Sequence, residues 1–134
     1  MEARDNLFRG KNEEGEWIEG FYVFQEKDQC EYNRKHLIFR NNPLGVYRTE
    51  VIPETVGKYT DLNDGEDFDG EKMFSGDIIE VDWNGKREKA LIWFTGGSFV
   101  YELSCGSLFH LDDADNPKII GNKTDNPELL ENKK

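Results

Sequence analysis

Carboxylates crowd one short segment of this sequence. The stretch 61–71, DLNDGEDFDGE, holds six acidic residues in eleven positions, and a hydrophobic stretch with strand character follows at 77–83. Carboxylate oxygens are the ligands that Ca²⁺ prefers in proteins, and a dense set of them also attracts basic partners. The segment therefore has three interpretations: a metal loop, a docking surface, or a solvated connection.

The spacing of these acids does not fit the best-defined calcium loop. An EF-hand needs oxygen ligands at loop positions 1, 3 and 5, Gly at position 6 and Glu at position 12. A loop that starts at Asp61 has Gly65 at position 5 and Lys72 at position 12. A loop that starts at Asp64 has Phe68 at position 5. We therefore expect a solvated segment held open by self-repulsion, without metal or cofactor, and keep an irregular Ca²⁺ site as the alternative.

Cysteine and histidine supply no second site. Cys30 and Cys105 lie far apart without a CxxC pair, and His36 and His110 are the only histidines. A tetrahedral zinc site takes about four such ligands at close spacing, so zinc is not expected. A nucleophilic Cys–His pair needs a base and an orienting group close in space, which no spacing here indicates. The two thiols are expected to be reduced, although spacing alone does not exclude a bridge between them.

Motifs of nucleotide binding and of nucleophilic hydrolases are absent. Neither GxxxxGK[ST] nor GxGxxG occurs, and the TGGS at 95–98 is not followed by Lys and a helix. The GSLFH at 106–110 is not a GxSxG elbow. Carboxylates are too numerous for any pair to stand out as general acid and base. The sequence thus predicts a protein that is not an enzyme.

Aromatic side chains are the remaining candidates for function. The chain has nine Phe, five Tyr and three Trp, more than a minimal core of this size requires. Each aromatic has a core interpretation, but some are expected to line an exposed groove for a protein partner; Trp83 and Trp93 belong to this group. The predicted partner-binding set combines aromatics with the acid segment: Trp17, Phe21, Tyr22, Asp61, Asp64, Glu66, Asp67 and Asp69.

The net charge of −11 is unevenly distributed. Residues 1–58 carry nine Lys/Arg and eleven Asp/Glu, a net −2, whereas residues 59–134 carry eight and seventeen, a net −9. Nucleic-acid binders carry basic stripes that displace counterions from phosphates, so nucleic acid is not the expected partner. The exception would be a basic patch beside aromatics in the first part: Arg34, Lys35, Arg40 and Arg48 with Tyr32, Phe39 and Tyr47.

Neither a leader nor a membrane span is indicated. The sequence has no apolar signal segment and no run of 18 or more apolar residues. We therefore expect residence in the cytoplasm and no membrane partner.

The elements that must position these side chains are strands. Mixed aromatic and β-branched residues alternate with polar ones in several segments bounded by turn formers: 15–25, 35–39, 46–52, 99–103, 108–111 and 118–122. Gly20 is a candidate bulge in the first segment, and Pro53 ends the third. The tail is expected to form at most one or two helical turns, capped by Asp125 or Asn126 with Pro127 in the first turn.

A hairpin over 77–94 is the best-defined local structure. Asn84-Gly85 separates two strand patterns, and this dipeptide tolerates the positive φ angles of a type I′ turn. The register then sets Asp82 opposite Arg87 and Glu80 opposite Lys89 on one face, with Ile79, Val81 and Trp83 on the other. Phe99, Tyr101 and Leu103 of the next strand are expected to point inward.

Short strands joined by tight turns favour a small barrel or roll, because closing a sheet removes its exposed edges. The predicted fold class is mainly β, with this barrel in the C-terminal half packed with an N-terminal β subdomain. The expected boundaries are 1–58, 59–121 and a tail at 122–134. Edge strands of a small β protein also pair between subunits, which leaves a homo-oligomer open.

Several motifs occur in the order found in the YopX family of phage and prophage proteins, which this chain resembles across nearly its whole length. They are LFRGK (7–11), GEWIEGFYV (15–23), IPETVGKYT (52–60), MFSGDIIEV (73–81), IIGN (119–122) and NPELL (126–130). The resemblance implies a mostly β protein whose C-terminal part is similar to an SH3-like barrel. It also implies residence in a bacterial host, no established activity and no catalytic residues.

The chain departs from the family pattern in the acid segment. Asp61 stands where relatives have Gly, and the link to MFSGDI is longer, which argues against a metal site common to the family. The pair Gly76-Asp77 is expected to form a turn into a strand, with Asp77 accepting hydrogen bonds from local backbone amides.

Four functions follow from these observations, in decreasing order. The first is a phage or prophage accessory module, without catalytic activity, that binds a host or phage protein. The second is an acidic DNA mimic that occupies a host nucleic-acid-binding protein. A β nucleic-acid binder that uses the basic patch is third, and an enzyme is last.

Overall fold

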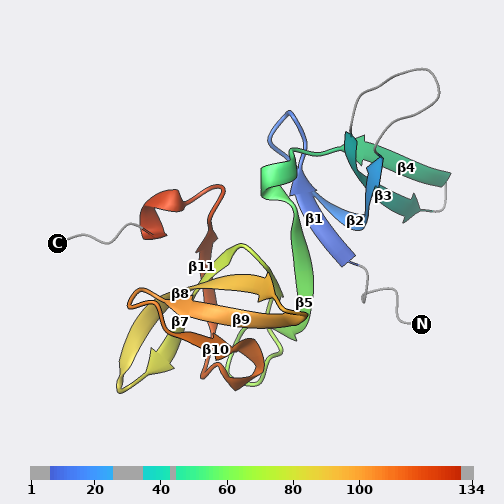
Figure 1. Ribbon diagram of the computed structural model, residues 1–134. Helices are drawn as coiled ribbons and strands as arrows, with labels where there is room; N and C mark the ends of the chain where they lie inside the picture. Colours follow the sequence, from blue (N-terminus) through green and yellow to red (C-terminus); the bar gives the residue numbers. More distant parts are fainter. Residues whose placement is uncertain (1–6, 26–34, 43–44, 131–134) are drawn as a thin grey trace. The chain divides into compact units, whose positions relative to one another are not determined.

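Strands account for nearly all of the regular structure. The computed structural model describes residues 7–25, 35–42 and 45–130, and within these ranges every helical segment is a short 3₁₀ turn (Figure 1). The mainly β fold class is thereby confirmed. The chain divides into two compact units, Met1–Tyr59 and Thr60–Lys134, and each is described by itself.

The first unit is an antiparallel meander in which each strand pairs with the next. Its strands are β1 (Leu7–Lys11), β2 (Trp17–Gln25), β3 (Lys35–Asn42) and β4 (Gly45–Glu50). After the 3₁₀ turn η2 (Pro53–Thr55), the start of β5 (Gly57–Asn63) pairs with the free side of β1. The alternation of residues had predicted β2 to β4 but not β1.

A small apolar cluster holds the first unit together. Ile18, Ile38 and Val51 are buried, with Phe8, Tyr22 and Val56 packed against them. Gly20 is not a bulge, because the β1–β2 register runs through it without a shift. Instead, a Cβ at this position would lie 2.2 Å from the carbonyl oxygen of Phe39. The sequence signal was correct about an unusual glycine, but its reason is the close approach of β3.

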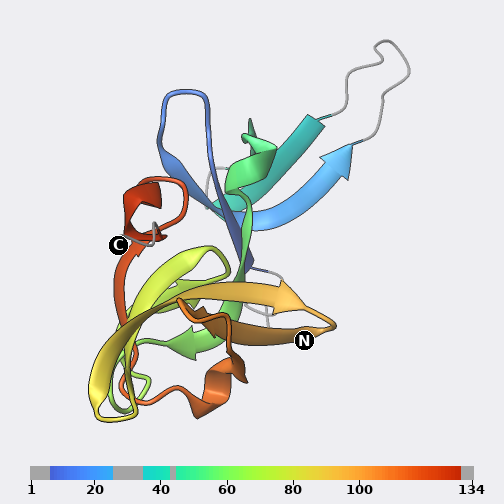
Figure 2. The ribbon, with the colours of Figure 1, turned by 60° about the vertical axis from the view of Figure 1, so that its left-hand side comes forward.

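The second unit contains a five-stranded antiparallel sheet in the order β10-β9-β8-β7-β11. Its strands are β7 (Asp77–Trp83), β8 (Lys86–Thr95), β9 (Ser98–Leu103), β10 (Leu108–His110) and β11 (Lys118–Asn122). The end of β5 and the short β6 (Lys72–Phe74) pair beside them in the other sheet, and the 3₁₀ turns are η3 (Leu111–Asp113) and η4 (Pro127–Leu130). Figure 2 shows the β7–β8 hairpin continuing into β9 as one curved ribbon.

The expected closed barrel does not form among the described residues. Strands β10 and β11 are the two edges of the five-stranded sheet and do not pair with each other. Strand β10 ends after His110, where the chain turns into η3. The free side of β11 is occupied at Ile119 by a side chain of the acid segment rather than by a strand. The SH3-like description of this part is therefore not confirmed.

The hairpin forms as predicted. Asn84 and Gly85 have φ angles of 57° and 80°, which a type I′ turn requires. The observed register sets Asp82 opposite Arg87 and Glu80 opposite Lys89. Because the turn chemistry is local, this part of the fold could be read directly from four or five neighbouring residues.

The core of the second unit is larger than that of the first. Its buried members come from β6 to β9 and from the η3 region: Met73, Ile79, Val81, Ala90, Ile92, Tyr101, Leu103, Leu111 and Ala114. Partly buried aromatics complete it, among them Trp83 and Phe99. The predicted inward direction of Ile79, Val81, Tyr101 and Leu103 is thus confirmed.

Candidate protein-binding surfaces

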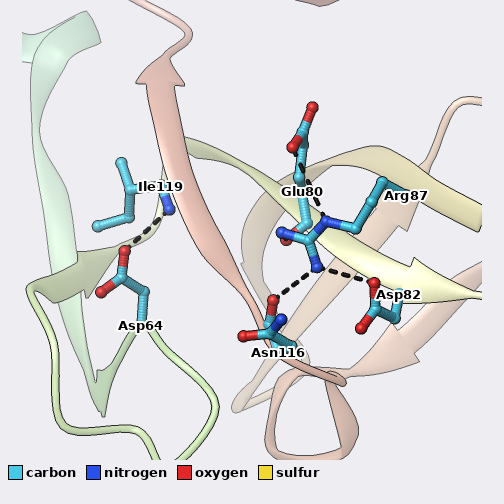
Figure 3. Close-up of polar contacts among 6 residues, drawn as sticks. All are labelled: Asp64, Glu80, Asp82, Arg87, Asn116 and Ile119. Carbon is cyan, nitrogen blue, oxygen red and sulfur yellow. Dashed lines mark hydrogen bonds and ion pairs between the residues drawn. The ribbon is translucent and has the colours of Figure 1, made fainter.

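Asp64 is the anchor of the acid segment. Its carboxylate is only 5% exposed and accepts hydrogen bonds from the backbone N–H of Glu71 (2.8 Å) and of Ile119 in β11 (3.0 Å; Figure 3). Its own N–H donates to the Glu71 carbonyl (2.8 Å), which closes the loop. The segment is therefore not a wholly solvated connection, and Asp64, predicted to bind a partner, has its carboxylate engaged within the chain.

Glycine makes this anchorage possible. A Cβ on Gly70 would lie 2.1 Å from Asp64 Oδ1, so only glycine lets the loop close around the carboxylate. Gly65 has a φ of 100°, and its N–H donates to the Pro117 carbonyl (2.6 Å). The acid segment is thus joined at two points to the chain that leads into β11.

The remaining acids face the solvent. Glu66, Asp67 and Asp69 are exposed, as is Asp61, which lies within β5 with a φ of 66°. The bonds to Pro117 and Ile119 bring this segment near a second acidic stretch, which the sequence analysis had not singled out: Asp112, Asp113 and Asp115. Among the described residues, no three His, Cys, Asp or Glu side chains are close enough to hold a metal ion.

Asp77 fulfils its predicted role. It is 1% exposed, and its Oδ2 accepts a hydrogen bond from the N–H of Phe74 (2.8 Å). Gly76 before it has a φ of 96°, so the pair forms a turn that leads from β6 into β7. The carboxylate therefore supports the scaffold and is not accessible to a ligand.

The three predicted aromatics of the first unit lie on two faces of the sheet. Trp17 and Phe21 share one face, since alternate residues of a strand do. Tyr22 points to the opposite face, where its ring packs against Phe8 and stacks on His36, and its hydroxyl is hydrogen-bonded to His36 Nδ1. Burial raises the pKa of Tyr22 above its ordinary value. Tyr22 is thus a structural residue, and the exposed set reduces to Trp17 and Phe21.

A surface named here the aromatic face surrounds Phe21, with a membership set by the strand register. Leu7 and Phe39 stand on either side of Phe21, and Trp17 and Val23 follow along β2. Phe21 and Val23 are 39% and 42% exposed. The guanidinium of Arg9 lies 4.5 Å from the centroid of the Trp17 ring, and Lys11 Nζ lies 5.5 Å from it.

The basic patch considered for nucleic-acid binding is divided between faces. Arg48 stands opposite Phe39 on the aromatic face, whereas Arg40, one residue further along β3, points to the other side. Tyr32 and Arg34 lie outside the described residues, and the side chains of Lys35 and Tyr47 are not described. The described part therefore offers a single arginine beside Phe39 and no continuous stripe.

The predicted thiol and histidine pairings have no described counterpart. Cys105 is a free, exposed thiol in the turn between β9 and β10, and Cys30 lies outside the described residues. The hydrogen bond with the Ser107 hydroxyl (3.4 Å) lowers the pKa of the Cys105 thiol below its ordinary value. His110 is exposed on β10.

A groove of about 530 Å³ lies over the second sheet on the face opposite its core, named here the outer face. Side chains of β8, β9 and η4 contribute to its wall, among them Arg87, Lys89, Leu91, Glu102, Leu129 and Leu130. Arg87 is held in place by Asp82 Oδ1 (3.0 Å), by the Asn116 carbonyl (2.8 Å) and by an ion pair with Glu80 (3.8 Å; Figure 3).

An exposed tryptophan and leucine extend this groove. Trp93 and Leu108 are 42% and 55% exposed. The indole Nε1 of Trp93 donates to Glu102 Oε1 (2.7 Å), and Leu108 and Leu91 flank Glu102 in the register. The sequence analysis named Trp93 but missed Leu91 and Glu102. The available signal was the run ALIWF in β8, which places apolar residues on both faces of one strand.

Comparison with protein families gives one match, to the family described as YopX protein, over residues 7–131. The resemblance expected from the sequence motifs is thereby confirmed. A comparison with curated proteins gives no match. Within the described ranges, no helix is long and apolar enough to cross a membrane.

Proposed function

This chain belongs to the YopX family, and on that premise we propose that it is a non-catalytic β module that binds a host or phage protein in the bacterial cytoplasm. Family membership supports the setting of a phage or prophage accessory protein. The described side chains support the mode of action, since the surfaces with the largest exposed apolar groups lie on sheet faces.

The observation that carries this proposal is the aromatic face of the first unit. Phe21 and Val23 lie two residues apart on one strand face, and both are more than a third exposed. Single exposed apolar residues are common on protein surfaces, whereas adjacent ones beside aromatics are typical of interaction sites. Trp17 and Phe39 extend the surface, and Arg9 and Arg48 add charge around it.

The aromatic face has the composition of an interface hot spot. Trp, Tyr and Arg contribute most of the binding energy in measured interfaces, usually near the centre of the contact. Here Phe21 would form the apolar centre, with the Arg9–Trp17 stack and Arg48 at the rim. A partner with an apolar patch and acidic surroundings fits this arrangement.

The test compares two variants in affinity capture from host lysate. Phe21→Asp places a charge at the centre of the aromatic face, and Arg40→Asp makes a larger charge change on the opposite face of the same sheet. We expect a reproducible partner with the wild-type chain and with Arg40→Asp, and its loss with Phe21→Asp. Equal recovery with both variants, or no reproducible partner at all, would refute the proposal.

A second candidate function is the acidic DNA mimic, and a specific observation favours it. The hydrogen bonds from Gly65 and to Asp64 join two acidic stretches, so Glu66, Asp67 and Asp69 share a region with Asp112 and Asp113. This function predicts that recovery of a basic partner falls steeply between low and high salt, because exposed charges are screened. Binding through the aromatic face predicts a weak dependence on salt.

Self-association is part of the same proposal. Strand β4 is an edge of its sheet, and edge strands are common sites of pairing between copies. Light scattering of the purified chain across a range of concentrations measures this directly. A constant monomeric mass would exclude a homo-oligomer.

A further inference from the structure

We propose that the groove on the outer face of the second unit binds a short basic and apolar segment of a protein partner, with Glu102 and Trp93 receiving a Lys or Arg side chain. The inference rests on the proposed function of protein binding and names a second surface and the chemistry of its ligand. It differs from the aromatic face, which belongs to the first unit.

Glu102 is a carboxylate placed among apolar neighbours. Leu91 stands across from it on β8, and Leu108 stands across from it on β10. Its printed contact is the neutral indole N–H of Trp93, and among the described residues it makes no ion pair. A carboxylate in such surroundings gains most from a cation that brings its own apolar stem, because removing both charges from water is offset only when they are paired.

Trp93 already shows how a cation is received. Lys123 Nζ, from the segment after β11, lies 5.8 Å from the centroid of its ring. Attraction between a cation and the face of an indole ring is strongest for tryptophan among the aromatic side chains. The exposed Trp93 ring and the Glu102 carboxylate that it contacts therefore form a two-part receptor for one cationic side chain.

The apolar wall of the groove fits the remainder of such a segment. Leu91 is half-buried at its floor, and Leu129 and Leu130 of η4 stand at its side, with Leu130 largely exposed. A volume of about 530 Å³ accommodates a few side chains of a peptide. Leucines on the wall favour aliphatic or aromatic residues beside the cationic one.

Charge selects this occupant over an acidic peptide or a nucleic acid. The groove is lined by Glu80, Glu88 and Glu102 against Arg87 and Lys89, and Arg87 is engaged by Glu80 and Asp82. Lys89 stands opposite Glu80 in the hairpin, which limits its repulsion of a cation. The surrounding unit has a net charge of −9 by sequence, so it attracts basic segments and repels phosphates.

The experiment selects ligands from a library of random peptides displayed on a carrier, with the full chain as bait. We expect the selected peptides to be enriched in Lys or Arg next to Leu, Ile, Phe or Trp. Their affinities are then measured with the wild-type chain, with Glu102→Gln and with the matched control Asp67→Asn. Gln keeps the oxygen that accepts from Trp93, so the sheet is preserved, and both variants remove one negative charge from the same unit.

The expected result is a loss of about tenfold or more in affinity with Glu102→Gln and less than about twofold with Asp67→Asn, since a central charged contact dominates binding and a remote charge does not. Trp93→Phe, which removes the N–H donor and keeps a ring, should weaken binding as well. It should also abolish the change in tryptophan fluorescence that bound peptide causes.

Three outcomes would overturn the proposal: no basic enrichment, equal losses with Glu102→Gln and Asp67→Asn, or selected peptides that shift amide resonances outside β8, β9 and η4. The second of these would show that peptides bind through net charge alone. Peptides that map to the aromatic face would overturn the groove and leave the proposed function standing. Specific groove binding without any captured host protein would separate the two in the other direction.

Discussion

The two units of this chain close their turns with different chemistry. In the first, Asn12 Oδ1 accepts from the N–H groups of Glu14 (3.0 Å) and Glu16 (2.8 Å), and Thr55 Oγ1 accepts from Lys11 N–H (2.8 Å). In the second, carboxylates perform this task at Asp64 and Asp77. A carboxylate has more acceptor sites than an amide oxygen and makes stronger bonds to backbone N–H groups.

The units also differ in the size of their cores. The cluster of the first unit has three buried members, whereas that of the second has nine. A small core leaves little reserve, because each residue removed is a large share of the total stabilisation. The comparison teaches that the acidic character of the second unit is partly structural: two of its acids are buried as acceptors, and only the others remain for a surface role.

The largest expected effect tests the difference between the cores. Ile38→Ala and Ile79→Ala remove the same atoms from sites that are both fully buried, and each should cost about 2–5 kcal/mol. Because its core is smaller, we expect Ile38→Ala to abolish hydrogen-exchange protection in the first unit while 60–130 stays protected. Ile79→Ala should lower protection in the second unit without abolishing it. Simultaneous loss throughout the chain in either variant would mean that the two units unfold together.

The next effect tests the carboxylate anchor. Asp64→Ala leaves two buried N–H groups, those of Glu71 and Ile119, without their acceptor, and should lower the free energy of unfolding by about 2–4 kcal/mol. The matched variant Asp67→Ala lies three residues away on the exposed part of the segment and should change it by less than about 0.5 kcal/mol. Urea denaturation measures both, and similar values would show that the loop is not anchored by Asp64.

A smaller effect concerns two tyrosines, one in each unit. Burial raises the pKa of Tyr22, whereas burial together with Asp113 and Asp115 raises the pKa of Tyr101. Added salt screens carboxylates but not burial, so the pKa of Tyr101 should fall in high salt while that of Tyr22 stays constant. Ring-carbon NMR titration at low and high salt measures both values.

The same pKa shift has a consequence for stability. The folded chain holds the Tyr101 proton more tightly than the unfolded chain does, so this contribution to stability is complete below the ordinary tyrosine pKa of about 10 and is lost as pH rises through the folded value. Tyr101→Phe should therefore lessen the alkaline loss of stability of the second unit. An unchanged pH profile would contradict this assignment.

The smallest effect is chemical. The Ser107 hydroxyl stabilises the Cys105 thiolate and lowers the pKa of the thiol. Ser107→Ala should raise that pKa and slow alkylation of Cys105 by iodoacetamide near neutral pH, where the thiolate fraction limits the rate. Peptide mass spectrometry follows Cys105 separately from Cys30. Equal rates in the two proteins would show that the hydrogen bond is not maintained in solution.

Local signals in the sequence predicted local structure well. Asn84-Gly85 determines both the turn and the register of its hairpin, and Gly76-Asp77 determines a turn within a few residues. The alternation in β9 likewise predicted which side chains point inward. In each case the interacting groups are neighbours in the chain, so composition and spacing carry the information.

Long-range partners could not be predicted in this way. Nothing in the acid segment distinguishes Asp64 from Asp67, because the difference is an N–H group of β11 far along the chain. Strand β5 was taken for a connection because its polar residues obscure the alternation, although Gly57 and Lys58 pair with β1. The groove escaped prediction for the same reason: Leu91 and Glu102 become neighbours only when β8 and β9 pair.

The bond between Asp64 and Ile119 has a consequence for the order of events during synthesis. These residues are 55 positions apart, and a ribosome adds roughly 5–20 residues per second. For some seconds the nascent chain therefore presents a complete first meander while the acidic stretch behind it still lacks its tether. Any chaperone or early partner that recognises this open form would meet a more negatively charged and more extensible segment than the finished protein displays.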